Sequence, residues 1–346
     1  MIGIRFKIFE PMMFRSSGEF SPEAKGPFTL AKSLPLPTPS TLAGAIASIF
    51  YEEGFLPSGE SWYEEFESIL GLKNDYMLKG PYLIAKDEKD TRMYVQYFDG
   101  LVDIDSLYQR SFIEILRKIM RNSIDTFKEL ENYQKHLRKL SDYLKDNKKK
   151  PKIQSKLGIS LDRSKSTIEG LIYSTEMVDY SNFGKECFIA FDATSEISFT
   201  KLSGKVTKLG GEGRITQIEI GEPLLTKKIE GIIKGKKFVL YLISPAFFKT
   251  TSELKSWSTE SNYMFPSPFE HLKQKIEKQS GVDVKTIFGK VSISSAGFKI
   301  DPEVKKPIYI TLEPGSIIFA SGSIPASISE IAQKIGYGVV IPIPLG

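Results

Sequence analysis

Residues 208–214 are Lys208-Leu209-Gly210-Gly211-Glu212-Gly213-Arg214, and the alternating residues 215–220 that follow predict a strand. The spacing of apolar residues over 202–209 predicts a short helix before this glycine-rich loop. A similar order ends the chain, where Lys334-Ile335-Gly336-Tyr337-Gly338 lies between a predicted helix and a predicted strand. We therefore expect an α+β protein made of two copies of a βαββαβ unit, the ferredoxin-like (RRM-like) arrangement.

The remaining elements of the first copy follow from local patterns. Period-two alternation over residues 2–8 predicts a strand that is buried on one face. Thr38 suits an N-cap and Pro39 suits the first turn of a helix that we expect to end before Gly54. We also expect a hairpin in which strands near 171–173 and 187–191 flank a turn at 181–184.

The second copy is expected to repeat this order. A strand at 238–243, a helix near 269–277 and strands within 287–300 and 307–319 are predicted from their patterns. Ser327 and Glu330 have the spacing of a capping box, which predicts a helix over 328–335 before the last strand at 339–343. We place the first domain at 1–222 and the second at 223–346.

Positive charge is concentrated in one segment. The 346-residue chain has 47 Lys and Arg against 42 Asp and Glu, but residues 106–150 hold 12 basic and 6 acidic residues. The pattern from about 62 to 151 is helical and charged and ends in the basic stretch 147–151, which we expect to form a mobile tip. We interpret about 60–155 as a helical insertion in the first domain, which either binds nucleic acid or faces water or a partner protein.

The cysteine content and the hydropathy pattern indicate in which cellular compartment the chain is located. Cys187 is the only cysteine, so an intrachain disulfide and a multi-thiolate zinc site are excluded, and we expect it to be a buried strand residue. The longest apolar stretch, 42–50, is much shorter than the roughly 18 residues that a membrane helix needs. We expect a cytoplasmic protein with no membrane contact.

The glycine-rich loop is the leading candidate for a phosphate-binding site. Gly210, Gly211 and Gly213 expose successive backbone N–H groups without side-chain obstruction, and Lys208 and Arg214 flank them. The plainer alternative is a helix C-cap. The loop matches neither a P-loop nor a dinucleotide-binding fingerprint, because the spacing and the order of elements differ.

Three further residues are candidates for RNA contact. Arg15 follows the first strand, and Ser40 and Thr41 lie near the N-terminus of the first helix. In a βαββαβ unit these positions would lie near the glycine-rich loop, where Arg15 could bind a phosphate or a base. Ser40 and Thr41 could donate N–H or hydroxyl hydrogen bonds to a phosphate.

The residues that usually carry catalysis are scarce. The two histidines, His136 and His271, have no partner implied by spacing, lie beside neither glycine loop and are expected to be solvated. The carboxylates form no Asp-x-Asp pattern that would suggest a two-metal nuclease. We predict no metal, no cofactor and no catalytic residue.

Seven segments, spread over nearly the whole chain, form a recognisable set: Phe14-Arg15 and residues 37–46, 158–162, 169–173, 209–214, 315–319 and 336–338. Together they resemble the RAMP (repeat-associated mysterious protein) superfamily of CRISPR proteins, most closely the handle-binding subunits of type III-B, or Cmr, effector complexes. The departures are local: Glu10-Pro11-Met12-Met13 replaces an expected acidic residue, and residues 16–20 lack an aspartate and a second arginine.

The resemblance implies two fused ferredoxin-like domains and binding of the 5′ repeat-derived handle of a CRISPR RNA. It also implies docking between the large polymerase-like subunit and the repeating backbone RAMP subunit of a ribonucleoprotein for antiviral defence, with no catalysis by this chain. Two alternatives remain open. One is a metal-independent endoribonuclease that processes CRISPR RNA, and the other is a purely structural adaptor.

Overall fold

The computed structural model describes residues 1–345 except 17–29, 89, 122–126, 162–166, 232–236, 250–267 and 296–306. Its largest element is an eight-stranded sheet with the order β10-β11-β1-β9-β3-β4-β5-β6. Neighbouring strands in this sheet are antiparallel, and Phe6 in the centre of β1 pairs with Ile218 on one side and Ile189 on the other. The strands are β1 (Ile2–Ile8), β3 (Leu78–Lys86), β4 (Thr91–Tyr97), β5 (Gly100–Asp103), β6 (Lys148–Lys149), β9 (Glu186–Ala193), β10 (Val206–Lys208) and β11 (Ile215–Gly221).

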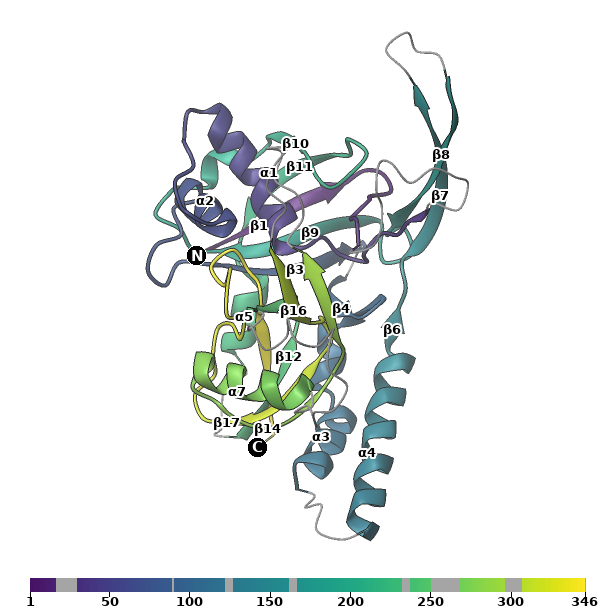
Figure 1. Ribbon diagram of the computed structural model, residues 1–346, viewed down its shortest axis with the longest axis vertical. Coiled ribbons are helices and arrows are strands. Elements are labelled where there is room, and N and C mark those ends of the chain that lie inside the picture. The colour runs from purple at the N-terminus through teal and green to yellow at the C-terminus, as the bar shows by residue number, and fades with distance from the viewer. Residues whose placement is uncertain are drawn as a thin grey trace, which may run out of the picture.

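Two helices, α1 (Pro39–Glu52) and α2 (Trp62–Ile69), cover one face of this sheet (Figure 1). The apolar side of α1 is buried in the same core cluster as Ile4 and Phe6 of β1. Burial of these side chains supplies the main driving force for docking the helix, at roughly 25 cal/mol per Å² of apolar surface. The strand at 2–8 and the first helix, with Pro39 in its first turn, are confirmed.

The second half of the chain forms two smaller sheets below the first in Figure 1. Their strand orders are β14-β17-β12-β18 and β13-β16-β15, and all of their pairs are antiparallel. The elements are α5 (Leu224–Glu230), β12 (Lys237–Leu242), β13 (Ala246–Phe248), α7 (Pro268–Ser280), β14 (Asp283–Phe288), β15 (Val291–Ser295), β16 (Ile308–Leu312), β17 (Ile317–Ser321) and β18 (Val340–Pro344).

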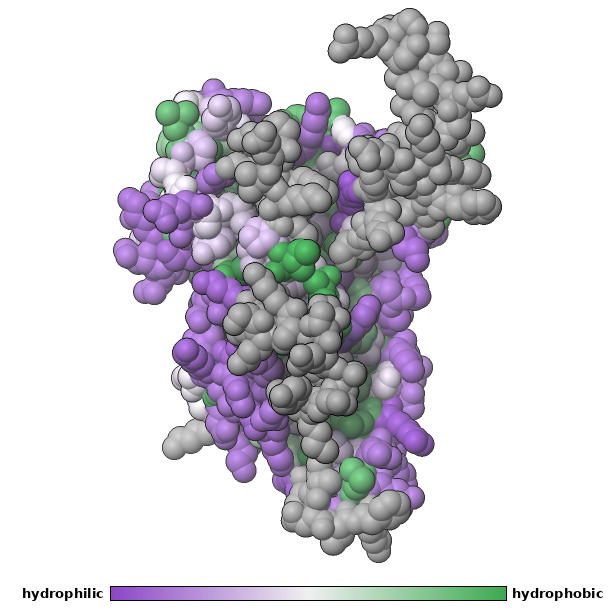
Figure 2. All heavy atoms as spheres, viewed as in Figure 1, coloured by the Kyte–Doolittle hydropathy of each residue, from purple (hydrophilic) through white to green (hydrophobic). Residues whose placement is uncertain are grey.

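A helical pair and a long hairpin extend from this body (Figure 1). Helices α3 (Arg110–Arg121) and α4 (Phe127–Asp146), which follow the short helix η1 (Ile104–Tyr108), bury Leu116 and Leu140 in one cluster with residues of β12 and β18. The hairpin of β7 (Lys152–Leu161) and β8 (Thr167–Asp179) is joined by β2 (Leu30–Ala31) at its base. In Figure 2 hydrophilic residues dominate the visible surface of the helical pair.

The structure is therefore a mixed α+β fold, as predicted, and in it Cys187 is buried, as expected. Among the described residues, no helix is both long and apolar enough to span a membrane.

The stretch 62–151 differs from the prediction, because it is not helical throughout. It contains β3, β4 and β5 between α2 and α3. Tyr82, Leu83 and Ile84 of β3 are all buried, so both faces of this strand are covered. A strand buried on both faces has no period-two pattern, and its apolar run cannot be distinguished from a helical one by periodicity. The expected tip at 147–151 is also wrong, because Lys148–Lys149 forms β6 and pairs with β5.

Two predicted helices are also wrong. The segment before the glycine-rich loop is a single 3-10 turn, η2 (Thr200–Leu202), followed by strand β10. Residues 328–332 are irregular and residues 333–338 form turns, because the Ser327 hydroxyl donates to the carbonyl oxygen of Tyr337 (2.7 Å) and the Glu330 carboxylate binds Lys275 (2.8 Å). Both polar side chains are thus committed to tertiary contacts and do not form a capping box.

The hairpin predicted around 181–184 is wrong in its pairing. Strands exist on both sides of this turn, but β8 pairs with β7 and β2, whereas β9 pairs with β1 and β3. Turn residues alone do not determine which strands pair across a fold, because long-range sheet contacts decide the pairing.

Candidate nucleic-acid interface

The glycine-rich loop connects two paired strands, β10 and β11, and its backbone requires glycine. The N–H of Leu209 donates to the carbonyl oxygen of Arg214 (2.9 Å) and closes the loop. Gly210 and Gly213 have φ of +77° and +64°, in the left-handed region that glycine adopts without strain. A Cβ on Gly210 would lie 2.3 Å from the carbonyl oxygen of Met13, so this loop packs directly on the segment that precedes Arg15.

Most N–H groups of the loop find no acceptor among the residues that the structure describes. Gly211 donates to the carbonyl oxygen of Met13 (2.9 Å), but the N–H groups of Gly210, Glu212, Gly213 and Arg214 donate to no other residue within the described ranges. Glu212 and Gly213 are consecutive left-handed residues, with φ of +60° and +64°. Unpaired N–H groups on such a turn form a concave surface that suits an anion.

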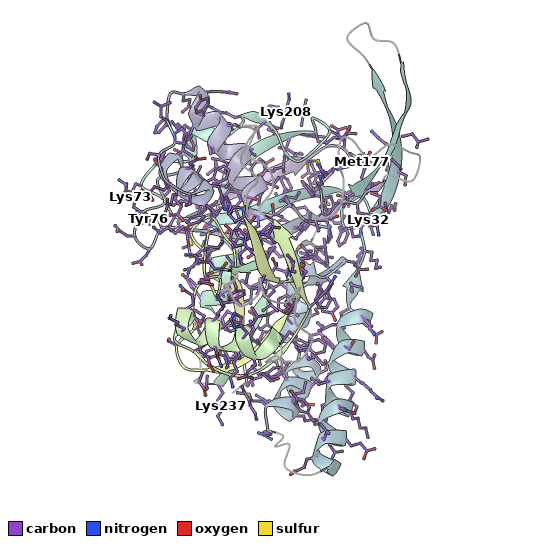
Figure 3. The ribbon with its side chains drawn as sticks, in the orientation of Figure 1. Lys32, Lys73, Tyr76, Met177, Lys208 and Lys237 are labelled. Carbon is purple, nitrogen blue, oxygen red and sulfur yellow. The ribbon has the colours of Figure 1, made fainter. Side chains whose placement is uncertain are left out.

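The two basic residues beside the loop differ in their surroundings. Lys208 is exposed and forms no ion pair within the described ranges, and it lies in the upper part of the body in Figure 3. The Arg214 side chain is only 13% exposed and its Nη1 forms an ion pair with the Glu10 carboxylate. Arg214 therefore anchors the loop to the end of β1, and an RNA phosphate would have to share its guanidinium with Glu10.

Arg15 lies close to the loop, as expected. A second basic residue, Lys32, lies beside it, although no sequence pattern predicted this. Residues 14–16 run beside 32–34: Leu34 N–H donates to Phe14 O (2.6 Å) and Ser16 N–H donates to Lys32 O (3.0 Å). Arg15 and Lys32 are both exposed. No local pattern links Lys32 to Arg15, because their proximity depends on pairing between segments distant in sequence.

Ser40 and Thr41 are oriented toward other residues of the fold. The Ser40 hydroxyl hydrogen-bonds the Tyr337 hydroxyl (2.9 Å), and the Thr41 hydroxyl hydrogen-bonds that of Thr38 (3.0 Å). Burial raises the pKa of Tyr337 to about 12, so the ring remains neutral. Among the described residues, α1 instead contacts β10 near the middle of the helix. There the carbonyl oxygen of Ala45 accepts a hydrogen bond from the Thr207 hydroxyl (3.4 Å).

The second glycine turn, 334–338, is a packing contact between the two halves of the chain. Leu78 N–H donates to the carbonyl oxygen of Lys334 (2.8 Å), and a Cβ on Gly336 would lie 3.2 Å from the carbonyl oxygen of Leu78. Its resemblance to the loop at 208–214 is therefore confined to sequence, and this turn presents no comparable anion-binding surface.

The histidines lie on elements other than the glycine loop. His136 is on α4 and His271 is on α7, and both are half-buried rather than fully solvated. Burial and the charges of Lys118, Lys139 and Lys135 lower the pKa of His136. No group of three or more His, Cys, Asp or Glu side chains is placed to hold a metal in the described part of the chain.

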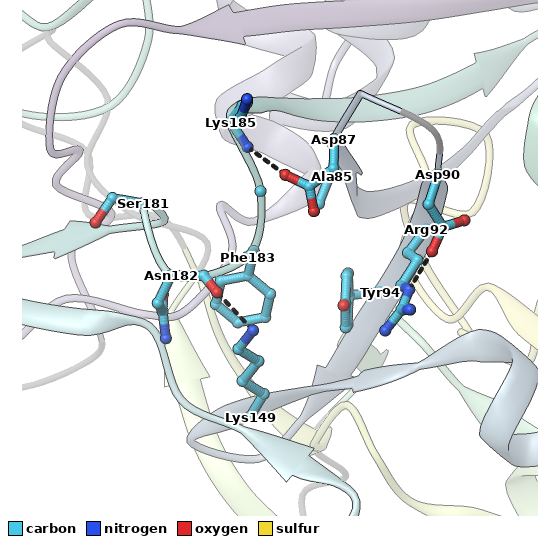
Figure 4. A pocket seen from close by; sticks show the side chains of 11 residues that line it. Ala85, Asp87, Asp90, Arg92, Tyr94, Lys149, Ser181, Asn182, Phe183 and Lys185 are labelled. Atoms are coloured by element: carbon cyan, nitrogen blue, oxygen red, sulfur yellow. Dashed lines mark hydrogen bonds and ion pairs between the residues drawn. The ribbon is translucent and has the colours of Figure 1, made fainter.

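A separate hollow of about 380 Å³ lies between the β3–β4 turn and the segment that links β8 to β9 (Figure 4). Its basic side chains are already engaged. Arg92 binds Asp90 (2.6 Å), the Lys149 ammonium donates to the carbonyl oxygen of Asn182 (2.5 Å), and Lys185 pairs with Glu88. The hollow is therefore a weaker candidate for anion binding than the glycine-rich loop.

Known proteins share this sequence and fold. A family model described as CRISPR-associated protein (Cas_Cmr3) matches residues 9–325. The CRISPR system CMR subunit Cmr3 of Saccharolobus solfataricus is 31% identical over 235 residues, which cover 66% of this chain and 66% of that relative, just under two thirds of its length.

Solved structures agree at the level of the fold. A chain of the type III-B Cmr-beta complex bound to cognate target RNA and AMPPnP matches with a TM-score of 0.59 and 21% identity, covering 92% of this chain and 86% of that one. A chain of the complex bound to cognate target RNA alone matches with a TM-score of 0.59 and 22% identity, at the same coverage. Since the family model spans most of the sequence, the chain belongs to the CRISPR-associated Cas_Cmr3 family, and the family predicted from its motifs is confirmed.

Proposed function

We propose that this chain binds the 5′ handle of a CRISPR RNA without catalysing a reaction, as a subunit that joins the large polymerase-like subunit to the backbone subunit of a Cmr complex. The single observation that carries the RNA-binding part is the set of N–H groups on the glycine-rich loop, at Gly210, Glu212, Gly213 and Arg214, that have no acceptor among the described residues. Backbone N–H groups bind phosphate oxygens without reading sequence, which suits a strand held by its backbone.

The charges around the loop support the same proposal. Lys208 flanks the loop, and Arg15 and Lys32 lie on the paired segments that adjoin Met13, on which the loop packs. A phosphate backbone laid across the loop would meet the basic side chains of the segments that adjoin it. Ser40 and Thr41 would act indirectly, by holding the N-terminus of α1 against Tyr337.

The two-unit architecture belongs to the same proposal. The large sheet contains the strand order β11-β1-β9-β3, and the smaller sheet has the order β18-β12-β17-β14. When these four strands of each half are numbered by their order in the chain, both sheets have the order 4-1-3-2. We interpret both as ferredoxin-like units, with domains at 1–222 and 223–346 and with α3 and α4 as the helical part of an insertion. The second helix of the second unit would be replaced by the non-helical segment 328–335.

The bridging role rests on the family and on the complexes in which similar chains are found. The similar chains belong to type III-B Cmr-beta complexes bound to cognate target RNA. An assembled complex purified through a tag on this chain should contain both the large subunit and the backbone subunit. Recovery of only one of them would contradict the bridge while leaving RNA binding open.

The RNA contact is tested with Lys208→Ala and the matched control Lys237→Ala, an exposed lysine at the opposite end of the molecule (Figure 3). Filter binding of handle-bearing RNA is measured over a salt series. We expect Lys208→Ala to weaken binding and to reduce the slope of log K against log salt by about 0.7, the value for one phosphate contact on a single strand. Equal affinity and slope for both variants would contradict the loop assignment.

A further inference from the structure

One face of the large sheet is covered over only part of its width. Tyr82, Ile84 and Phe188 on β3 and β9 are buried in a cluster with residues of the second half. On β10, β11 and the end of β1 the same face carries large apolar side chains in solvent: Val206 is 62% exposed, Ile215 49% and Phe9 59%.

The strand register places two of these side chains at the foot of the glycine-rich loop. Lys7 pairs with Gln217, and Phe9 and Ile215 each lie two residues beyond that pair toward the same end of the sheet, so they share its face. Lys208 pairs with Ile215, which adds a lysine to the same row. Glu10, next to Phe9, holds Arg214 of the loop.

An exposed aromatic ring beside exposed aliphatic side chains indicates a contact surface, because solvent-facing apolar groups gathered in one place are uncommon on soluble proteins. The charges nearby favour a nucleic acid as the occupant. Lys7 is neutralised by Glu186 (2.5 Å), whereas Lys208 has no ion-pair partner among the described residues. The loop N–H groups that have no acceptor in the described part of the chain adjoin the same row.

We propose that Phe9 and Ile215 form a platform on which an unpaired base of single-stranded RNA stacks, while the adjacent phosphate lies on the glycine-rich loop. This inference rests on the proposed handle binding and adds to it the site at which one base of the RNA stacks. Stacking on an aromatic ring tolerates any base, because every base has a π-face. The platform therefore contributes affinity and orientation and leaves sequence discrimination to other contacts.

The test compares Phe9→Ala with Phe9→Trp and with Tyr51→Ala, an equally exposed aromatic residue on α1, at 58%. Synthetic handle RNA carries 2-aminopurine at each position in turn, and its fluorescence and affinity are measured with the full chain. We expect Phe9→Ala to weaken binding about 5- to 150-fold and to abolish quenching at one position. Phe9→Trp should retain both signals, and Tyr51→Ala should match the unmodified protein.

Failure of the platform is distinguishable from failure of the handle proposal. Unchanged affinity and quenching in Phe9→Ala, together with weakened binding in Lys208→Ala, would overturn the platform and leave handle binding standing. Unchanged affinity in both variants would overturn both proposals. A loss of a neighbouring subunit from the Phe9→Ala complex at unchanged RNA affinity would assign this face to a protein contact and would also overturn the platform.

Discussion

Gly210→Ala should destabilise the protein more than Gly204→Ala, although the two glycines have nearly the same backbone conformation. Gly210 has φ of +77° and Gly204 has φ of +80°, so a side chain at either position costs about 1–2 kcal/mol of backbone strain. The positions differ in their surroundings. A Cβ at Gly204 would meet no atom within 4 Å, whereas at Gly210 it would lie 2.3 Å from the Met13 carbonyl oxygen and 3.0 Å from the Phe14 ring.

The added methyl group at Gly210 must therefore push the loop away from Met13. Such a shift would stretch the hydrogen bond from Gly211 to Met13, which is 2.9 Å long, and a typical hydrogen bond contributes about 0.5–1.5 kcal/mol. We expect Gly210→Ala to lower the free energy of unfolding by at least about 1 kcal/mol more than Gly204→Ala, the order of an overpacked site.

The assay is urea unfolding of both variants beside the unmodified protein, with handle-RNA affinity measured on each folded protein. Gly204→Ala should retain RNA affinity, whereas Gly210→Ala should lose it, because the displaced loop no longer presents its N–H groups. Equal urea midpoints for the two variants would refute the reasoning that the loop depends on close packing against Met13.

Three further predictions follow from buried or paired groups. Burial raises the pKa of Cys187 to about 11, so its thiol should not react with a thiol reagent at neutral pH in the folded protein but should react in urea; rapid labelling of the native state would contradict its burial. Burial alone would raise the pKa of Asp99, but hydrogen bonds from Lys148 and Lys150 outweigh it and hold the value at about 2. The Asp99 side chain is 58% exposed, so solvent screening limits its contribution to up to about 1 kcal/mol of stability at neutral pH. This contribution should be lost as the pH falls from about 4 through 2, and a stability difference from Asp99→Asn that persists at pH 2 would count against it. Tyr82→Phe should cost about 1–3 kcal/mol in urea unfolding, because the Tyr82 hydroxyl donates to buried Asp192 (2.7 Å), and an unchanged midpoint would show that this bond contributes nothing.

Local sequence predicted those parts of the fold whose signal is local. The alternation over 2–8 identified β1, and Pro39 after Thr38 located the start of α1. The strands β3 to β5 were missed because burial on both faces removes the alternation that identifies a strand. The capping-box pattern at Ser327 failed because a tertiary bond to Tyr337 takes the hydroxyl.

The same distinction applies to the candidate site. The glycines and Lys208 form a continuous motif, so their proximity follows from sequence alone. The pairing of Arg214 with Glu10 and the position of Lys32 beside Arg15 depend on contacts across long separations, for which no local pattern exists. Phe9 was likewise indistinguishable from a core residue until the sheet showed that it faces solvent.

Crosslinking in an assembled complex shows directly whether the glycine-rich loop holds the CRISPR RNA handle. Handle RNA with 4-thiouridine at defined positions is irradiated in the complex, and crosslinked peptides are identified by mass spectrometry. If the loop holds the handle, crosslinks will form to peptides that contain Arg15 or residues 208–214 of this chain. Crosslinks found only on neighbouring subunits would contradict it and would support a purely structural adaptor.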